Sequence, residues 1–142
     1  MTIKAIRYHD FSAGHRVCGH ENKCAHLHGH NYRVYFHCNA KELDGIGRVI
    51  DFSVIKQLLC EWIEENWDHK MLIWTGDTIY EKVKDIDSNG VVAVPFNPTA
   101  ENMAKYLVDK VAPDLLPIEI TLDKCVVWET RKCGASYELC NQ

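Results

Sequence analysis

The feature that most constrains the fold is a two-residue alternation of side-chain character in residues 30–39. Four apolar side chains alternate with more polar ones, Tyr32, Val34, Phe36 and Cys38 against Arg33, Tyr35, His37 and Asn39. Successive side chains of a β-strand point to opposite faces of the sheet, so the pattern predicts a strand with one buried face. Residues 2–14 are compatible with a second strand, although their alternation is less regular. A sheet is therefore the expected frame of the molecule.

Two other stretches have the period of a helix. In residues 52–66 the apolar side chains recur at the i, i+3, i+4, i+7 and i+8 positions of one helical face, and Asp51 stands where an N-cap is expected. A similar apolar stripe runs through residues 99–111. Either Asn97 or Thr99 is expected to cap this second helix.

The end of the chain predicts two further strands. Pro113 and Pro117 are expected to prevent the second helix from continuing. Residues 118–130 and 135–140 then form strands joined by a turn around Lys132-Cys133-Gly134.

The order of these elements is strand, strand, helix, helix, strand, strand. It predicts the α+β class, with an antiparallel sheet covered on one face by two helices. Polar residues 76–90 are expected to form a surface excursion with room for a short helical turn, and residues 91–96 a short strand. With no repeat or linker in the sequence, residues 1–142 are expected to form a single domain.

Composition and charge narrow the classes of function. Apolar residues make up 46% and charged residues 25%, as in ordinary globular proteins. No apolar run approaches the roughly 20 residues of a membrane span, and the N-terminus lacks an apolar signal region, so a cytoplasmic location is expected. The net charge of −4 gives no support for binding to nucleic acid or to an anionic membrane, although a local basic pocket could still hold a phosphorylated substrate.

Cysteine usage indicates reduced thiols. The seven cysteines are odd in number, and no secretory signal accompanies them, so a disulfide-stapled secreted domain is disfavoured. No CxxC pair is present, and a four-cysteine zinc site therefore has no support.

The sharpest local motif is His28-Gly29-His30. Residues i and i+2 of a strand face the same side, about 7 Å apart at roughly 3.3 Å per residue, so two imidazoles there can converge on one ion. His15, at the far end of the first predicted strand, is a good third ligand because an antiparallel partner would bring it close. Three imidazoles with an open position are typical of catalytic zinc. Taken alone, however, a His-X-His motif is weak, since histidines often simply pack or lie in water.

Acid–base groups accompany the three histidines. Cys24, four residues before His28, could act as a general base if a nearby positive charge stabilises its thiolate, although most cysteines are inert core thiols. In Asp68-His69 a carboxylate could orient an imidazole, although such pairs are often solvated. Glu129, beside large apolar residues, would need partners if it were buried, and a guanidine-like ligand edge would supply them. The alternative is an outward-facing strand glutamate.

Six motifs in one order give these weak signals a common interpretation. They are Phe11-Ser12-Ala13-Gly14-His15, Cys24-Ala25-His26-Leu27-His28-Gly29-His30-Asn31-Tyr32, Val49-Ile50-Asp51-Phe52, Asp68-His69, Asn97-Pro98-Thr99-Ala100-Glu101-Asn102 and Trp128-Glu129-Thr130. From about residue 3 to residue 138, the chain resembles the 6-pyruvoyl-tetrahydropterin synthase family. Within it, the sequence most resembles the 6-carboxy-tetrahydropterin synthase branch, because three residues separate Cys24 from His28.

The resemblance implies a T-fold (tunnelling fold), a four-stranded antiparallel sheet with two helices on one face, and subunits that assemble as a homohexamer with active sites between them. It implies that His15, His28 and His30 bind Zn²⁺ and that Cys24 is the general base. It further implies that Asp68 and His69 relay protons from a neighbouring subunit. Glu129 would then anchor the pterin ring, and Thr99 would line its pocket.

The activity that the resemblance implies is conversion of 7,8-dihydroneopterin triphosphate to 6-carboxy-5,6,7,8-tetrahydropterin, acetaldehyde and triphosphate, in the synthesis of 7-deazaguanine compounds such as preQ0 and queuosine. Two alternatives stay open. One is a 6-pyruvoyl-tetrahydropterin synthase, which eliminates triphosphate without cleaving the side chain. The other is a non-catalytic zinc- or pterin-binding member of the fold. The segment between residues 69 and 97 is longer than in compact bacterial members.

Overall fold

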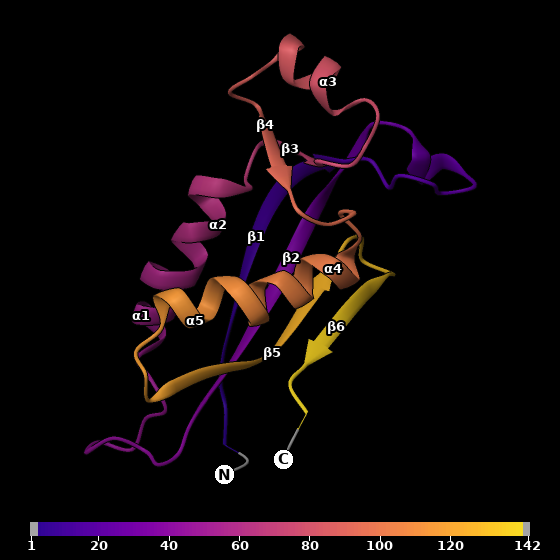
Figure 1. Cartoon of the computed structure of the whole chain (residues 1–142). Coiled ribbons are helices and arrows are strands. Elements are labelled where there is room, and N and C mark those ends of the chain that lie inside the picture. Colours follow the sequence, from indigo (N-terminus) through magenta and orange to yellow (C-terminus); the bar gives the residue numbers. More distant parts are fainter. Residues whose placement is uncertain (1–2, 141–142) are drawn as a thin grey trace.

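A computed structural model describes residues 3–140, and its centre is one six-stranded mixed sheet (Figure 1). The strands follow the spatial order β4-β3-β1-β2-β5-β6. Their bounds are β1 (Ala5–His15), β2 (His28–Ala40), β3 (Lys70–Trp74), β4 (Val91–Val94), β5 (Ile120–Trp128) and β6 (Gly134–Glu138).

The four predicted antiparallel strands are present as β1, β2, β5 and β6, paired in that order. The prediction of a sheet with only four strands was wrong, because β3 pairs in parallel with β1, and β4 in parallel with β3. The sequence of β3 gave no alternation to detect, since Leu72 and Ile73 are consecutive and both fully buried. Strands buried on both faces have continuous apolar runs instead. The short strand expected in residues 91–96 is β4.

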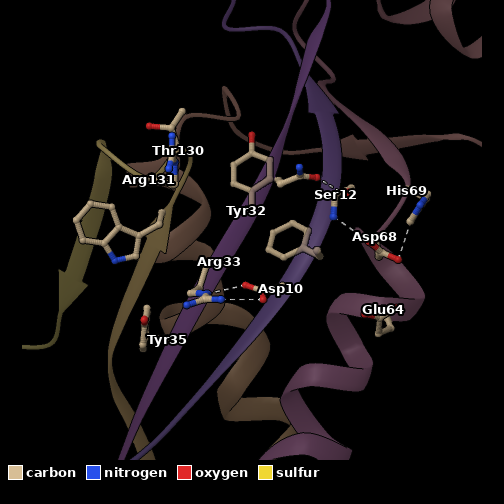
Figure 2. A pocket seen from close by; sticks show the side chains of 13 residues that line it. Asp10, Ser12, Tyr32, Arg33, Tyr35, Glu64, Asp68, His69, Thr130 and Arg131 are labelled. Atoms are coloured by element: carbon tan, nitrogen blue, oxygen red, sulfur yellow. Dashed lines mark hydrogen bonds and ion pairs between the residues drawn. The ribbon is translucent and has the colours of Figure 1, made fainter.

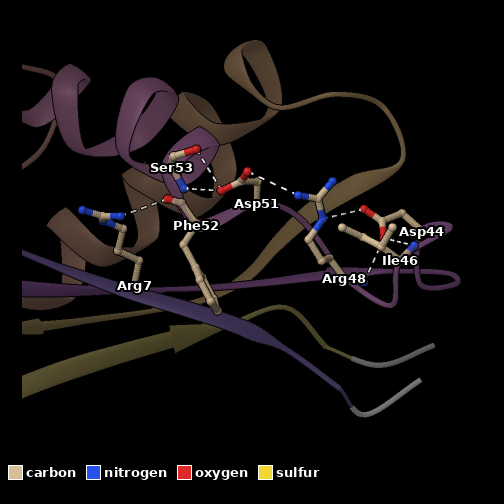
Figure 3. Close-up of polar contacts among 7 residues, drawn as sticks. All are labelled: Arg7, Asp44, Ile46, Arg48, Asp51, Phe52 and Ser53. Carbon is tan, nitrogen blue, oxygen red and sulfur yellow. Dashed lines mark hydrogen bonds and ion pairs between the residues drawn. The ribbon is translucent and has the colours of Figure 1, made fainter.

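The first predicted helix runs without a break through α1 (Phe52–Ile55), the π-helical turn η2 (Lys56–Cys60) and α2 (Glu61–Asn66). Asp51 is its N-cap, as expected: the Asp51 carboxylate accepts the Ser53 N–H at 2.8 Å (Figure 3). Arg48 contacts the other carboxylate oxygen of Asp51 and also forms an ion pair with Asp44, which ties the preceding loop to the start of the helix.

The second helix comprises α4 (Ala100–Tyr106), the π-helical turn η3 (Leu107–Val111) and α5 (Ala112–Leu115). Thr99, rather than Asn97, caps it: the Thr99 hydroxyl accepts the Asn102 N–H at 3.1 Å. The expectation that Pro113 would end the helix was wrong. In the π-helical turn, Ala112 N–H bonds the Leu107 carbonyl five residues back, and Pro113 then lies at the first positions of α5, where a missing N–H costs little.

Both helices pack on one face of the sheet, and in the described part of the chain the opposite face carries no helix (Figure 1). The core lies between the two layers and contains large side chains with almost no exposure, among them Trp67, Tyr32, Phe36, Ile63 and Met103. The excursion at residues 76–90 holds the expected helical turn as α3 (Tyr80–Ile86). Within residues 3–140, no helix combines the length and the apolar character that a membrane crossing requires.

Candidate metal centre and active site

Three histidines meet where β1 ends and β2 begins. The antiparallel register places His15 opposite His28 and Ala13 opposite His30, so the three imidazoles share the helix-covered face. Their nearest ring nitrogens all lie within 4.8 Å of one another, and the Nε2 atoms of His15 and His28 are 3.1 Å apart. The grouping predicted from His28-Gly29-His30 and His15 is therefore present.

Backbone carbonyls fix the tautomers of two of these rings. His15 Nδ1–H donates to the Pro98 carbonyl at 2.6 Å, and His28 Nδ1–H donates to the His26 carbonyl at 2.7 Å. Because Nδ1 carries the proton in both rings, each Nε2 presents a lone pair to the centre of the group. His30 Nε2 is buried and has no hydrogen-bond partner among residues 3–140. Three converging imidazole lone pairs fit a zinc ion, with a further position left for substrate or water.

Burial favours the neutral form of two of the three imidazoles, His15 and His30. Desolvation lowers the pKa of His15, which is fully buried, and that of His30, because both imidazolium forms lose contact with water. Glu129 works in the opposite direction on both rings but does not overcome burial. Neutral imidazole is the form that binds metal, so burial favours the metal-binding form of His15 and His30.

Glu129 lies beside the histidines, directly after β5. Its Oε1 atom is 3.4 Å from His15 Nε2 and 3.5 Å from His30 Nε2. The Glu129 N–H donates to the Cys133 carbonyl at 3.0 Å, which holds the residue in the β5–β6 turn. The side chain is 24% exposed, so it can still be reached from solvent. This placement brings a carboxylate acceptor next to the position that an ion would take.

Cys24 belongs to the loop that joins β1 to β2. It sits in the short 3₁₀ helix η1 (Lys23–Ala25), and its carbonyl accepts the Val17 N–H at 2.8 Å. The pKa of Tyr32 is raised well above its usual range, first by burial and then by the nearby charges of Glu129 and Cys24. The Tyr32 hydroxyl oxygen is itself 3.2 Å from His15 Nδ1, so Tyr32 belongs to the surroundings of the three histidines together with Glu129.

Asp68 and His69 form a pair of their own between α2 and β3. Asp68 Oδ1 accepts the Ser12 N–H at 2.9 Å, and Asp68 Oδ2 accepts His69 Nδ1–H at 2.8 Å (Figure 2). Burial acts to raise the pKa of Asp68, but these hydrogen bonds outweigh it and hold that pKa below its ordinary value. The ionised carboxylate therefore orients the His69 ring by accepting its Nδ1–H.

The pair forms no direct polar contact with the three histidines of its own chain among the described residues. No hydrogen bond or ion pair between described residues connects Asp68 or His69 with His15, His28 or His30. The two residues line a cavity of about 780 Å³ on the face of the sheet opposite the two helices, and the His69 side chain is 80% exposed (Figure 2). His69 also lines a second cavity, of about 490 Å³, to which His30 contributes. His69 has a φ of 59°, a left-handed conformation that is uncommon outside glycine.

Sequence reasoning missed several contacts of the site. Thr99 was expected to line the pterin pocket, and in the structure its side chain caps the second helix by accepting the Asn102 N–H. Pro98 holds His15 through a backbone carbonyl, which no side-chain pattern signals. Tyr32 was taken only as a core residue because its place in the alternation of β2 accounts fully for its burial. The Asn97-Pro98-Thr99 motif was the one feature of the sequence that pointed to residues contacting the site from the start of the second helix.

Comparison with known proteins identifies the family. Residues 4–140 match the family model described as 6-pyruvoyl tetrahydropterin synthase. The chain belongs to this family. A protein from Rickettsia bellii named 6-carboxy-5,6,7,8-tetrahydropterin synthase is 38% identical, with 92% of this chain and 96% of that protein covered. An Aquifex aeolicus protein of the same name is 32% identical, with 90% and 93% covered. The prediction that the chain is an enzyme, a synthase of this family, is confirmed by these matches.

Solved structures support the fold. An uncharacterized protein, WS1659, from Wolinella succinogenes superimposes with a TM-score of 0.82 at 23% identity, covering 96% of this chain and 97% of that one. The 6-pyruvoyl tetrahydropterin synthase of Caenorhabditis elegans gives a TM-score of 0.64 at 24% identity, with 97% and 96% covered. The α+β class and the T-fold are thus confirmed, with two strands more than predicted.

Proposed function

We propose that the protein is a zinc-dependent 6-carboxy-5,6,7,8-tetrahydropterin synthase. The observation that carries the proposal is the convergence of three imidazole nitrogens, with His30 Nε2 buried and unpaired beside Glu129. This set of donors suits zinc with a position open for substrate oxygen. The choice of reaction is supported by the names of the curated relatives and by the three-residue spacing between Cys24 and His28.

The proposed reaction converts 7,8-dihydroneopterin triphosphate and water to 6-carboxy-5,6,7,8-tetrahydropterin, acetaldehyde and triphosphate. Zinc held by His15, His28 and His30 would supply Lewis acidity toward the hydroxyls of the substrate side chain. Glu129 accepts hydrogen bonds from the amino and ring N–H groups of the pterin. These contacts orient the side chain of the substrate toward the histidines.

Cys24 and the Asp68–His69 pair carry the proton transfers in this proposal. The Cys24 thiolate removes a carbon-bound proton next to the ring, and His69, oriented by the Asp68 carboxylate at 2.8 Å, exchanges protons on the opposite side. No hydrogen bond or ion pair between described residues joins the pair to the histidines of its own chain, and the family resemblance implies that it serves the site of a neighbouring subunit. From the same resemblance we expect a homohexamer of about 98 kDa, six times the 16.4 kDa of one chain.

The second candidate is a 6-pyruvoyl-tetrahydropterin synthase. It is favoured by the description of the matching family model, and it would use the same metal ligands. The two reactions differ in whether the side chain is cleaved after triphosphate leaves. A non-catalytic pterin-binding role is the third candidate, but such a protein would have no need of Cys24, Asp68 and His69. The product of the first candidate would enter the synthesis of 7-deazaguanine compounds such as preQ0 and queuosine.

Product analysis separates these candidates. The zinc-loaded protein is incubated with 7,8-dihydroneopterin triphosphate, and the products are identified by mass spectrometry. We expect 6-carboxytetrahydropterin together with acetaldehyde. A 6-pyruvoyl product without acetaldehyde would establish the second candidate instead. Unchanged substrate, with zinc shown to be bound, would favour the third. Cys24→Ala is the matched control, because it should retain zinc and lose turnover, whereas full activity in this variant would refute the role of Cys24.

A further inference from the structure

The loop of residues 16–27, which carries Cys24, has little regular structure to fix it. Between β1 and β2 it contains only the single turn η1, and most of its side chains are at least partly exposed. Its first residue, Arg16, forms an ion pair with the buried Asp77 at 3.0 Å. Its last residue leads directly into His28 and β2. A general base in such a loop needs a further contact to hold its position relative to the metal ligands.

Asn97 supplies this contact. Its side-chain Oδ1 accepts the Cys18 N–H at 2.9 Å, and its Nδ2–H donates to the Cys18 carbonyl at 2.8 Å. The carboxamide thus satisfies both backbone groups of one loop residue, much as a neighbouring strand would. Apart from His28, which flanks the loop, Asn97 is the one side chain outside it that hydrogen-bonds its backbone within residues 3–140.

The contact is transmitted to Cys24 through one adjacent peptide. Val17, the neighbour of Cys18, donates its N–H to the Cys24 carbonyl at 2.8 Å. Holding the Cys18 peptide in place therefore also fixes the donor that holds Cys24. Hydrogen bonds of ordinary length, together with the covalent link between Cys18 and Val17, therefore connect the Asn97 carboxamide to Cys24.

Asn97 is itself fixed at the start of α4, next to the group that orients His15. The Asn97 carbonyl accepts the Thr99 N–H at 2.7 Å and the Asn102 side-chain N–H at 2.9 Å. The following residue, Pro98, offers its carbonyl to His15 Nδ1–H at 2.6 Å. Two consecutive residues thus set the direction of a predicted metal ligand and the position of the cysteine loop from one rigid point.

We propose that Asn97 is a positioning residue that holds the Cys24 loop in register with the metal-binding histidines. The consequence for turnover rests on the proposed function, in which Cys24 is the general base, but the positioning role itself does not. Asn97 acts through the backbone of Cys18 and Val17 and does not need to touch the substrate.

Two variants test the proposal. Asn97→Asp keeps the shape and the acceptor but loses the Nδ2–H donor, and Asn97→Ala removes both bonds. Asn39→Ala is the matched control: this half-buried asparagine donates to Asp123 at 2.7 Å, near the opposite end of β2. Zinc content, amide hydrogen exchange of Val17 and Cys18, and the alkylation rate of Cys24 by iodoacetamide are measured for each variant. Alkylation of the exposed Cys133 gives an internal reference.

Both Asn97 variants should retain zinc, because the bond from His15 to the Pro98 carbonyl remains. Amide exchange at Val17 and Cys18, and labelling of Cys24, should rise about tenfold in Asn97→Ala, the order expected for the loss of two hydrogen bonds to a partly buried peptide. Labelling of Cys133 should not change. Unchanged exchange and labelling in both variants, or an equal change in Asn39→Ala, would overturn the proposal.

Two further measurements complete the test: the kinetics of the variants and the amide exchange of the unaltered protein. A fall in kcat of about tenfold with KM nearly constant is expected if the displaced loop carries the general base. Faster labelling of Cys24 with unchanged kcat would uphold the positioning role and refute the role of Cys24 as base. If neither variant folds, the unaltered protein still decides: slow exchange at Val17 and Cys18, as in α4, supports the proposal, and the fast exchange of an unheld loop overturns it.

Discussion

The proton positions on the imidazoles decide what the site can bind. Two carbonyls, from Pro98 and His26, force the protons of His15 and His28 onto Nδ1. Because a carbonyl cannot donate, the opposite nitrogens remain free acceptors. The same arrangement orients metal-bound histidines in general, and partners of this kind are worth about 10–100-fold in metal affinity.

We predict that His28→Ala loses zinc. Removing one of three ligands should weaken zinc binding by more than about 100-fold, since even the outer partners of ligands have effects approaching that size. The zinc content of the purified variant, measured by mass spectrometry with inductively coupled plasma, should fall close to zero. His37→Ala is the control, because this imidazole lies in the same strand but on the opposite face. A normal zinc content in His28→Ala would contradict the ligand assignment.

What the sequence reveals at this scale depends on whether a contact uses a side chain or the backbone. His28-Gly29-His30 was informative because a strand has a period of two, and His15 followed from antiparallel pairing. Pro98 was not detectable as a partner of His15, since any residue offers a carbonyl. The conformation of His69, with its φ of 59°, also left no sign in the sequence, because histidine is only one of several residues that tolerate it.

At the scale of elements, the second helix depends on its N-terminal cap. We predict that Thr99→Ala lowers the free energy of unfolding by about 1 kcal/mol, because the Asn102 N–H loses the hydroxyl that accepts it. Urea denaturation measures the change. Thr99→Ser keeps a hydroxyl at the same place and should unfold close to the unaltered protein. Equal stability of Thr99→Ala and the unaltered protein would show that the cap contributes nothing.

The elements that the sequence predicted are those with a repeating pattern or a recognisable turn. Strand β2 and both helices were found because their buried side chains recur every two or every 3.6 residues, whereas β5 and β6 were placed by the turn around Lys132-Cys133-Gly134 that joins them. Strand β3 was not predicted, because a short run of residues buried on both faces has no alternation. The prediction that Pro113 ends the second helix was wrong, because the π-helical turn before this residue shifts the hydrogen-bond pattern. Such local changes of pitch arise from packing and leave no mark in the spacing of apolar residues.

At the scale of the whole molecule, the seven cysteines are all free, and burial divides them into classes. Burial raises the pKa of Cys38 to about 12 and also raises the pKa of Cys60 and Cys125, so these thiols stay protonated at pH 8. We predict that iodoacetamide at pH 8 labels Cys133 and Cys140 rapidly and leaves the three buried thiols unmodified until denaturant is added. Peptide mass spectrometry measures the labelling. Fewer than seven thiols in the denatured, unreduced protein would instead indicate disulfides.

The separation of the Asp68–His69 pair from the three histidines leads to a prediction about the assembly. If each active site combines Cys24 from one subunit with His69 from a neighbour, Cys24→Ala and His69→Ala hexamers should each be inactive. Subunits of the two variants that are mixed, unfolded together and refolded should regain activity. With random assembly, a given site receives an intact Cys24 in half of cases and an intact His69 in half, so about a quarter of the unaltered activity should return.

The control for this experiment is refolding of each variant alone, which should stay inactive and give the same assembly by light scattering. Recovery can arise only if the two residues come from different chains, because no single chain in the mixture carries both. If the mixture remains inactive although mixed hexamers are shown to form, Cys24 and His69 must act within one chain. The loop that carries Cys24 and the connection that carries His69 would then have to move together on binding substrate, through a change that the present arrangement of β1, β2 and β3 does not contain.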